Sequence, residues 1–404
     1  MFMEFKRGLD RDLWLLLGEM FSRRLVMGFL EVVRPIYFSL IGFSPIEIGI
    51  LMGIGTIVSA FESLIFGSLS DRHGRKLFIL LGSIFSVFRL VLYAISRDFW
   101  VLIIAQGIGA IGEGAGAGQP IVSGYIADKT DVRDRAHVFS ALAISSAASG
   151  TIGSLMAVLP AYFQVRLSLD EVSAHILLFW LGAAANAFAV ACALPIKEPR
   201  KKREQERDVH LQGLSWKEVG KFSIVRSTDG LGMGLVTQLL PLYFYLSFGA
   251  DSEDLAPIYA LARVLTIPSF LFVPFFVSRL GNVKCLIISR IVTGLVIVFF
   301  AIASSFHVSA ALFISYRLLF EFAMPMRQAF STELVKSHQT GTMLGISNSS
   351  RAFFQSLAPA IAGYLFEVAS LSIPLFSGAA LLTINGLQYY VFYRKPPSQL
   401  PASS

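Results

Sequence analysis

A short polar loop between two apolar segments decides the fold of this chain: Gly67-Ser68-Leu69-Ser70-Asp71-Arg72-His73-Gly74-Arg75-Lys76. The apolar segments at 46–68 and 77–96 are each long enough for a membrane helix, which needs about 20 mostly apolar residues. A glycine within the loop permits a tight turn, and its cluster of basic residues is typical of loops on the cytoplasmic side of a membrane. The stretch therefore predicts two membrane helices joined by an inner loop.

The composition of the whole chain also indicates a membrane protein. Hydrophobic residues make up 54% of the 404 residues and charged residues 15%, whereas soluble domains carry about 25% charged residues. Apolar runs separated by turn and charge signals predict twelve spans. These spans lie near 13–40, 46–68, 77–96, 99–127, 136–163, 173–195, 216–248, 256–277, 284–304, 308–333, 341–366 and 371–392.

Lysine and arginine are distributed unequally about these spans. With the N-terminus inside, 22 of the 34 Lys and Arg residues fall in inner segments and two in outer loops, so we expect both termini on the cytoplasmic side of the cell membrane. This bias explains the net charge of +7 without a nucleic-acid partner. The two cysteines lie in separate apolar segments and the six histidines near span ends. We therefore expect no disulfide, metal, cofactor or enzyme active site.

The two halves of the chain resemble each other. Pro35-Ile36-Tyr37-Phe38 matches Pro241-Leu242-Tyr243-Phe244 at an offset of 206, and Glu113 matches Glu321 at 208. One long polar stretch divides the spans six and six. We predict an N-terminal six-helix bundle at 1–195, a cytoplasmic central loop at 196–215 and a C-terminal six-helix bundle at 216–404. Two related bundles with a site between them are typical of transporters.

The loop quoted above resembles the GxLaDrxGrk loop of the major facilitator superfamily. The matching positions are Gly67, Asp71, Arg72, Gly74, Arg75 and Lys76. The resemblance extends along the chain, since Pro120 to Asp128 is similar to the family's fourth span and Leu194 to Arg200 to its exit from the sixth. It implies an all-α membrane protein of twelve transmembrane helices in two pseudo-symmetric six-helix bundles. It also implies that the loop latches one conformation, with Asp71 meeting a helix N-terminus or a basic neighbour.

Two departures from the family pattern concern the coupling ion. The RxxqG pattern of the fourth span is present at Gln106-Gly107, but Ile103 stands at its arginine position. The gxxxGPxxGG pattern of the fifth span is only partly matched by Gly150-Thr151-Ile152-Gly153. Proton-driven antiport is therefore less well supported than the family resemblance itself.

Apart from lysines at the inner ends of the predicted spans, which are counted with the inner segments, ten basic residues fall within the spans, and all ten are arginine: Arg23, Arg24, Arg34, Arg89, Arg226, Arg263, Arg290, Arg317, Arg327 and Arg351. The acidic residues at similar depth are Glu19, Glu31, Glu62, Glu113, Asp229 and Glu321. A charge at the centre of a bilayer costs at least about 2.5 kcal/mol on insertion scales, so such residues usually face a bundle interior or a wet cavity. They are the candidate functional residues.

The predicted substrate site combines charges from both halves. It comprises Arg24, Glu31, Arg34, Glu113, Arg226, Asp229, Arg317 and Glu321. The alternative for any one member is structural: pairing within its own helix, as in Glu19 with Arg23 or Arg226 with Asp229, or snorkelling toward a membrane surface, as for Arg290 and Arg351.

The candidates for proton coupling are Glu62, Glu113, Glu31 and Asp229. Glu62 and Glu113 have no opposite charge three or four residues away on their own helix, and a buried unpaired carboxyl can exchange protons near neutral pH. Either residue could instead pair with an arginine of another span.

The favoured function is secondary active transport of a small organic solute by alternating access, as proton-coupled efflux of amphipathic compounds. We expect a monomer in the lipid bilayer whose partners are the solute and protons. One alternative is an organic-anion transporter that uses the intramembrane arginines, because guanidinium groups bind carboxylates and phosphates bidentately. A second alternative is a non-transporting sensor or a lipid transporter on the same fold.

Overall fold

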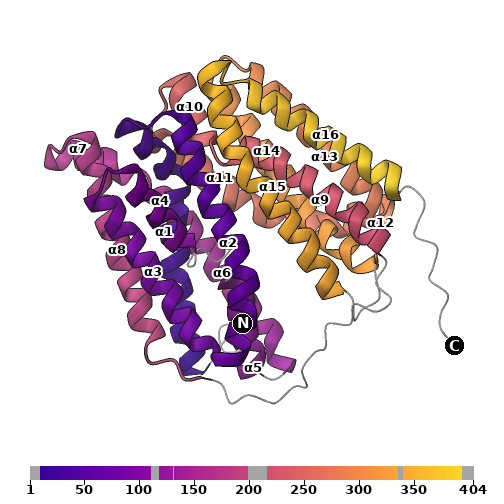
Figure 1. Ribbon diagram of the computed structural model, residues 1–404, viewed down its shortest axis with the longest axis horizontal. Helices are drawn as coiled ribbons and strands as arrows, with labels where there is room; N and C mark the ends of the chain where they lie inside the picture. Colours follow the sequence, from indigo (N-terminus) through magenta and orange to yellow (C-terminus); the bar gives the residue numbers. More distant parts are fainter. Residues whose placement is uncertain (1–9, 111–117, 131, 199–215, 335–339, 394–404) are drawn as a thin grey trace. The chain divides into compact units, whose positions relative to one another are not determined.

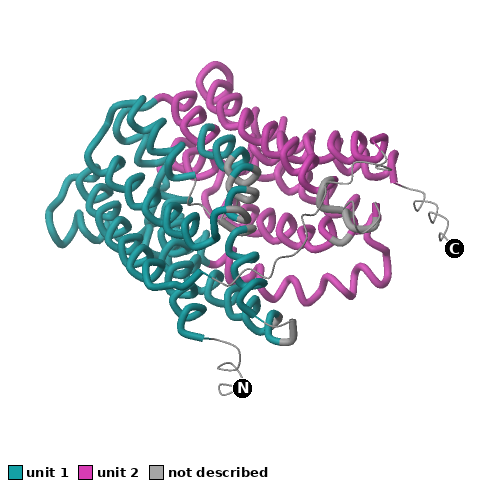
Figure 2. The backbone as a smooth tube through the Cα atoms, turned by 60° about the horizontal axis from the view of Figure 1, so that its bottom comes forward, with its two compact units in different colours: residues 1–43, 54–206, 250–260 teal, residues 44–53, 207–249, 261–404 magenta. Residues whose placement is uncertain are grey.

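The computed structural model describes residues 10–110, 118–130, 132–198, 216–334 and 340–393, and within these ranges the chain is helical with short turns and no strand (Figure 1). By Cα proximity the chain divides into two compact units, which Figure 2 colours separately. Unit 1 comprises Met1–Phe43, Ile54–Glu206 and Ala250–Ala260, and unit 2 comprises Ser44–Gly53, Arg207–Gly249 and Leu261–Ser404. The simpler division at residues 195 and 216 stays a prediction.

The helices follow the predicted spans closely. In the first half they are α1 (Arg11–Leu40), α2 (Pro45–His73), α3 (Arg75–Ile95), α4 (Phe99–Ala110), α5 (Gly118–Lys129), α6 (Val132–Met156), α7 (Leu159–Leu167) and α8 (Glu171–Ala193). In the second half they are α9 (Trp216–Thr237), α10 (Leu240–Phe248), α11 (Ser252–Ser269), the 3₁₀ helix η2 (Phe270–Phe272), α12 (Val273–Leu280), α13 (Asn282–Ile302), α14 (Phe306–Glu333), α15 (Thr340–Val368) and α16 (Ile373–Tyr393).

Prolines break three of the spans that the sequence predicted as continuous. Pro160, Pro241 and Pro274 each lie in the first turn of a new helix, α7, α10 and α12. Proline lacks the N–H that a helix interior needs but is tolerated in a first turn, so a new helix starts there. Pro35, the first-half counterpart of Pro241, instead lies inside the unbroken helix α1.

Seven helices or helix pairs of the described chain are long and apolar enough to cross a membrane by length and composition alone. They span Arg75–Ile95, His137–Leu167, Glu171–Ala193, Trp216–Phe248, Ser252–Leu280, Asn282–Ile302 and Phe306–Gln328. The helix α1 is also long enough at 30 residues, but it carries Glu19, Arg23, Arg24, Glu31 and Arg34 within its predicted span. Charge therefore masks the membrane character of α1 in a hydropathy profile.

Helices pair in the same pattern in both halves of the chain. In the first half α1 packs against α6 and α8, and α3 packs against α4 and α8; in the second half α9 packs against α15 and α16, and α13 packs against α14 and α16. If the helices are numbered by predicted span within each half, the pairs are the same: the first span packs against the fifth and sixth, and the third against the fourth and sixth. The corresponding helices α3 and α13 also each carry a fully buried arginine, Arg89 at 1% and Arg290 at 0% exposure, although at different positions along the two helices. This common pattern supports the predicted duplication.

Glycines allow the closest of these helix contacts. A Cβ built on Gly28 of α1 would lie 2.5 Å from the backbone oxygen of Gly150 in α6. A Cβ on Gly230 of α9 would lie 2.3 Å from the backbone oxygen of Arg351 in α15. Small residues let membrane helices approach until their backbones touch, so these two positions set the spacing of α1 with α6 and of α9 with α15.

Candidate functional site

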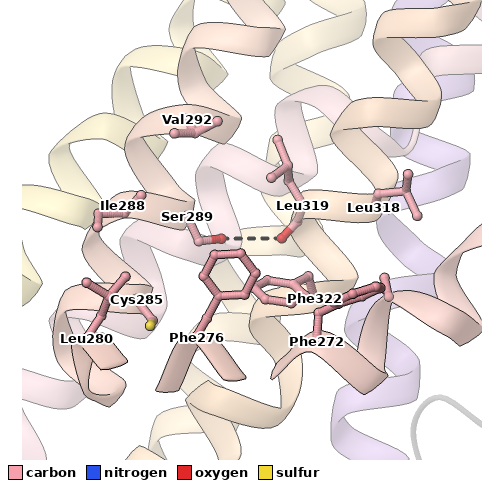
Figure 3. A pocket seen from close by; sticks show the side chains of 11 residues that line it. Phe272, Phe276, Leu280, Cys285, Ile288, Ser289, Val292, Leu318, Leu319 and Phe322 are labelled. Carbon is pink, nitrogen blue, oxygen red and sulfur yellow. Dashed lines mark hydrogen bonds between the residues drawn. The ribbon is translucent and has the colours of Figure 1, made fainter. Parts of the chain in front are cut away.

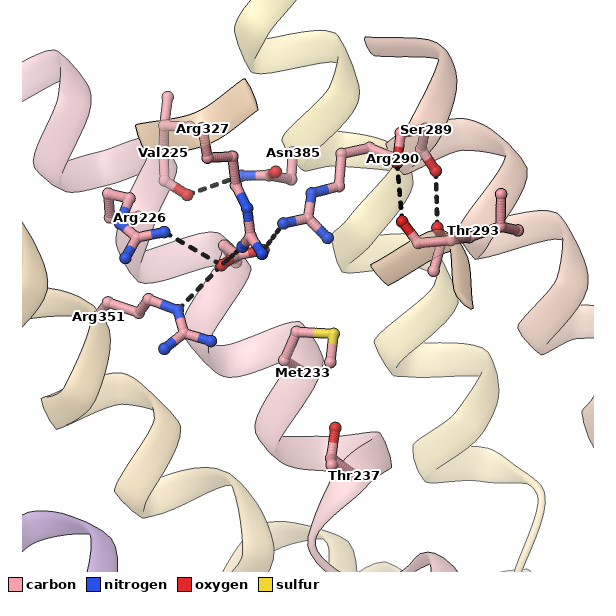
Figure 4. A network of polar contacts seen from close by, with 12 residues as sticks. Val225, Arg226, Met233, Thr237, Ser289, Arg290, Thr293, Arg327, Arg351 and Asn385 are labelled. Atoms are coloured by element: carbon pink, nitrogen blue, oxygen red, sulfur yellow. Dashed lines mark hydrogen bonds and ion pairs between the residues drawn. The ribbon is translucent and has the colours of Figure 1, made fainter. Parts of the chain in front are cut away.

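The most concentrated group of charges in the described chain surrounds one carboxylate of unit 2, that of Asp229 on α9. Four arginines from four helices of this unit converge on it (Figure 4). Their nitrogens lie at these distances from its oxygens: Arg290 Nη2 2.5 Å from Oδ1, and Arg327 Nη1 3.0 Å, Arg351 Nε 3.0 Å and Arg226 Nη1 3.6 Å from Oδ2. We call these five residues the Asp229 cluster.

The members of the Asp229 cluster differ in depth. The side chains of Asp229, Arg290 and Arg327 are 2%, 0% and 7% exposed, whereas those of Arg226 and Arg351 are 15% and 22% exposed. The cluster therefore has a buried side, formed by α13 and α14, and a more accessible side, formed by α9 and α15. Four guanidiniums against one carboxylate give it a formal net charge of +3.

Neutral groups hold the cluster in place. Arg226 Nη2 donates to Asn348 Oδ1 at 2.7 Å, and Asn385 Nδ2 donates to the backbone oxygen of Val225 at 2.7 Å. The guanidinium carbon of Arg327 lies 4.9 Å from the ring centroid of Phe320, a distance typical of a cation–π contact. The contacts with Asn348 and Phe320 orient Arg226 and Arg327 without neutralising them.

Unit 1 has a smaller charged group at the corresponding helix. Glu19 of α1 is fully buried and accepts from Arg23 Nη1 at 2.8 Å and from Ser83 Oγ of α3 at 2.7 Å. Nearer the other end of α1, Arg34 Nη1 donates to Gln106 Oε1 of α4 at 3.1 Å, and the same oxygen accepts from Tyr93 Oη at 2.6 Å. These contacts tie α1 to α3 through Glu19 and to α4 through Arg34.

The predicted site residues are distributed over both units. Arg24, Glu31 and Arg34 are half-buried on α1 in unit 1; Arg317 and Glu321 are half-buried on α14 in unit 2, as is Arg226, while Asp229 is buried. Glu113 lies outside the described residues, and so does the side chain of Glu62 on α2. Of the predicted set, the ion pairs bring together Arg226 and Asp229, which are three residues apart.

Three members of the Asp229 cluster were not predicted as site residues: Arg290, Arg327 and Arg351. The alternative that Arg290 and Arg351 snorkel does not hold, because both guanidiniums form ion pairs with Asp229. The sequence signal that points to these three residues is the surplus of arginine over aspartate and glutamate in predicted spans 7 to 11. That surplus indicates that several arginines share an acid, but helical spacing cannot tell which ones do.

The inner loop of unit 1 shows a different partner from the one expected. Gly74 has a φ of 99°, a conformation that favours glycine, which confirms the predicted turn. The exposed N-terminus of α3 is capped by Glu198, whose carboxylate accepts from the backbone N–H groups of Arg75 at 2.7 Å and Lys76 at 2.8 Å. A carboxylate at this end is favoured by the helix dipole.

A second carboxylate also contacts this loop, because Arg75 Nε lies 2.6 Å from Asp128 Oδ2 at the end of α5. The side chains of Asp71 and Arg72 and the surroundings of Gly67 on α2 are not among those described, so the part of these residues in a latch stays a prediction.

Another ion pair ties the end of α5 to the start of α1. Lys129 Nζ contacts Asp12, and it lies 3.2 Å from Asp10 Oδ2. Burial opposes the charged form of this lysine, but the hydrogen bonds and the charges of Asp12 and Asp10 outweigh it and raise the pKa of Lys129. Lys129 therefore keeps its positive charge through the physiological pH range.

Unit 2 also contains an apolar pocket of about 340 Å³ (Figure 3). Its lining comes from the end of α11, η2, α12, α13 and α14. Among the lining residues, Ser289 Oγ donates a hydrogen bond to the backbone oxygen of Leu319 at 3.3 Å (Figure 3). No charged side chain lines it. Phe272 and Phe276 at its edge are 59% and 42% exposed, so the pocket suits an apolar group and not a charged one.

In the described residues there is no group of three or more His, Cys, Asp or Glu that could hold a metal ion.

Comparison with known proteins gives a consistent result. The family model described as Major Facilitator Superfamily matches residues 16–359. Multidrug resistance protein 1 of Bacillus subtilis (strain 168) is 25% identical over 97% of this chain and 98% of its own length. Quinolone resistance protein NorA of Staphylococcus aureus (strain MRSA252) is 22% identical over 89% and 91%.

Solved structures show the same likeness of fold. The nucleoside transporter NupG has a TM-score of 0.75 at 15% identity, over 96% of this chain and all of its own. The human organic anion transporter MFSD10 (TETRAN) has a TM-score of 0.59 at 14% identity, over 94% and 99%.

Proposed function

Because the chain belongs to the Major Facilitator Superfamily, a family of transporters, we propose that it exports small amphipathic organic compounds by alternating access, driven by protons. The match confirms the family resemblance and the fold class predicted from the sequence, an all-α membrane protein with twelve helices in two bundles. Transport by this chain follows from its family, whereas the direction, solute class and coupling ion are our proposal.

The names of the relatives support export. Two proteins that match nearly the whole chain are named for resistance to multiple drugs and to quinolones. Resistance through a membrane transporter requires movement of the compound out of the cell. We propose the same direction for this chain, with compounds that combine an apolar body and a polar or charged group.

The observation that carries the proposal is the burial of charged groups inside membrane helices of both units. Glu19 of unit 1 and Asp229 of unit 2 are 0% and 2% exposed. Such groups are expensive in a membrane and typically mark a solute or ion pathway. A protein that served only as a membrane scaffold would fold more easily without them.

The proposed proton carriers are Glu31, Glu62 and Glu113. Asp229 was also a candidate, but its four ion pairs suit the role of counter-ion to the arginines. Arg24, Arg34, Arg317 and Glu321 remain proposed contacts of the solute. We propose that Gly67, Asp71, Arg72, Gly74, Arg75 and Lys76 form the latch of one conformation.

The test uses purified protein in proteoliposomes, with ethidium as the amphipathic probe and an imposed pH gradient. We expect ethidium to move in the direction opposite to the protons. Glu62→Gln or Glu113→Gln should abolish the part of the ethidium flux that the pH gradient drives, while passive exchange continues. Glu253→Gln, at an exposed helix start, is the matched control and should keep coupling. Unchanged coupling in both variants would remove these two residues as carriers, and absence of gradient-driven flux would contradict proton-driven export.

The Asp229 cluster favours a second candidate, transport of organic anions, because its net charge is +3. Guanidinium groups bind carboxylates and phosphates with two parallel hydrogen bonds. Exchange of a labelled aromatic carboxylate against the unlabelled compound, without a pH gradient, would support this candidate. Movement of ethidium alone would support the first.

A further inference from the structure

The Asp229 cluster has more positive charge than its own residues neutralise. In the described part of the chain, Asp229 is the carboxylate with which Arg226, Arg290, Arg327 and Arg351 form ion pairs. Buried charges are stable only when opposite charges and hydrogen bonds compensate them. One carboxylate compensates one of four guanidiniums, so the arrangement is suited to an additional anion.

Unused hydrogen-bond donors lie at the same place. Arg290 is 0% exposed, and its Nε and Nη1 are buried without a hydrogen-bond partner among the described residues, as is Nε of Arg327. A buried donor without an acceptor is costly, and most buried donors in native proteins are paired. These N–H groups therefore indicate acceptor oxygens that the described residues do not supply.

The accessible side of the cluster shows where such an anion would enter. Arg226 and Arg351 are its more exposed members, and each touches Asp229 with only part of its guanidinium: Nη1 of Arg226 and Nε of Arg351. Asn348 holds Arg226 from the other side through a neutral amide oxygen. Both guanidiniums thus keep donors for a ligand while Asp229 fixes their positions (Figure 4).

We propose that the Asp229 cluster binds the doubly charged head of a phosphate or phosphonate monoester, with Arg226 and Arg351 as the first contacts and Arg290 and Arg327 as the buried positive charges. This inference rests on the second candidate function, transport of organic anions, and narrows its solute class. A phosphate monoester presents three acceptor oxygens and about −1.5 to −2 charge at pH 7. It reduces the net charge from +3 to about +1, whereas a carboxylate or a phosphate diester leaves +2.

The test compares three aromatic ligands that differ in their head: phenyl phosphate, methyl phenyl phosphate and benzoate. Binding is measured calorimetrically on the full chain in nanodiscs of neutral lipid at pH 7.5. We expect phenyl phosphate to bind at least about ten-fold more tightly than either monoanion. The diester also stands for the head of an ordinary phospholipid, so equal affinity for diester and monoester would indicate a lipid site and overturn the proposal.

The pH dependence of binding separates ligand charge from protein charge. Phenyl phosphate loses its second charge near pH 6, so its advantage over the diester should vanish between pH 7.5 and pH 5. The titratable residues that interact with the cluster are Tyr389, Tyr316 and, through Tyr316, Glu321. The diester keeps a single charge over this range, so any change in its own affinity with pH reports a titration of the protein and not of the ligand. A ratio independent of pH would contradict recognition of a dianion.

Substitutions locate the site. Arg226→Gln and Arg351→Gln should each weaken phenyl phosphate at least ten-fold and affect the diester less. Arg279→Gln is the matched control, because Arg279 is an exposed arginine of the same unit that stacks on Phe275, 4.2 Å from its ring centroid; it should bind as the unmodified protein does. If a glutamine variant does not fold, Arg351→Lys keeps the charge but loses the bidentate fork, and should still reduce the preference for monoester over diester.

Wild-type affinity in the variants of both Arg226 and Arg351 would overturn the site. Because binding is measured without flux, the two proposals can fail separately. Selective binding of phenyl phosphate by a protein that transports nothing would contradict the proposed function and keep the site. Transport of ethidium by a protein without monoester selectivity would contradict the proposed site and keep the proposed function.

Discussion

At the scale of single residues, the same side chain serves different purposes according to its neighbours. Arg23 meets one acid four residues away on its own helix, and Arg75 meets Asp128 near the end of a helix. Arg290 is fully buried and shares one carboxylate with three other arginines. An exposed pair contributes little to stability, but removing one partner of a buried pair leaves a charge that nothing compensates. Asp229 is therefore the residue whose loss should matter most.

Asp229→Asn should lower the free energy of unfolding by about 3 kcal/mol or more, because four guanidiniums would then repel one another without a counter-ion. Thermal unfolding of the purified protein in one detergent measures the change. The double variant Asp229→Asn with Arg290→Met should recover part of the loss, since it also removes a buried positive charge. Glu253→Gln, an exposed acid, should change stability by less than about 1 kcal/mol. A similar small change for Asp229→Asn would show that the cluster is not a structural centre of unit 2.

At the scale of helices, close contact between α9 and α15 positions three of the five members of the Asp229 cluster. Gly230 follows Asp229 directly, and its missing Cβ lets the backbone of Arg351 approach. Arg351 can then reach Asp229 Oδ2 through Nε, the first nitrogen of its guanidinium. The helix contact and the ion pair therefore depend on the same small residue.

Gly230→Ala should destabilise the protein by about 1–3 kcal/mol, because the added Cβ would lie 2.3 Å from the backbone oxygen of Arg351, where overpacking forces a backbone shift. It should also weaken the binding of phenyl phosphate. Gly220→Ala is the matched control on the same helix, since a Cβ there meets nothing within 4 Å; it should be neutral or stabilise α9 by up to about 1 kcal/mol. Equal effects of the two substitutions on thermal unfolding would contradict the role of the close contact.

At the scale of the whole molecule, the distribution of basic residues determines orientation in the membrane. The predicted inner segments carry 22 Lys and Arg residues and the outer loops two. The positive-inside rule then places the loop at 67–76 and the region after α8 in the cytoplasm. This orientation stays a prediction.

Cysteine labelling in intact cells tests the orientation. In a background with Cys192→Ala and Cys285→Ala, a cysteine replacing Ser304, an exposed residue between α13 and α14, should react with a membrane-impermeant maleimide. A cysteine replacing Lys197, an exposed residue after α8, should react only after permeabilisation. The opposite pattern would invert the topology and place both termini outside.

The sequence by itself determined the membrane class, the places of the apolar spans and the family, and it indicated a duplication, because each of these is written in local composition, charge spacing or a short loop. It also predicted the pairing of Arg226 with Asp229, which one helical turn brings together. Only the tertiary structure decided that Arg290, Arg327 and Arg351 share the same carboxylate. Arg327 and Arg351 are 98 and 122 residues from Asp229 along the chain. Helical periodicity says which face of a helix a side chain occupies, but the packing of four helices decides which faces meet.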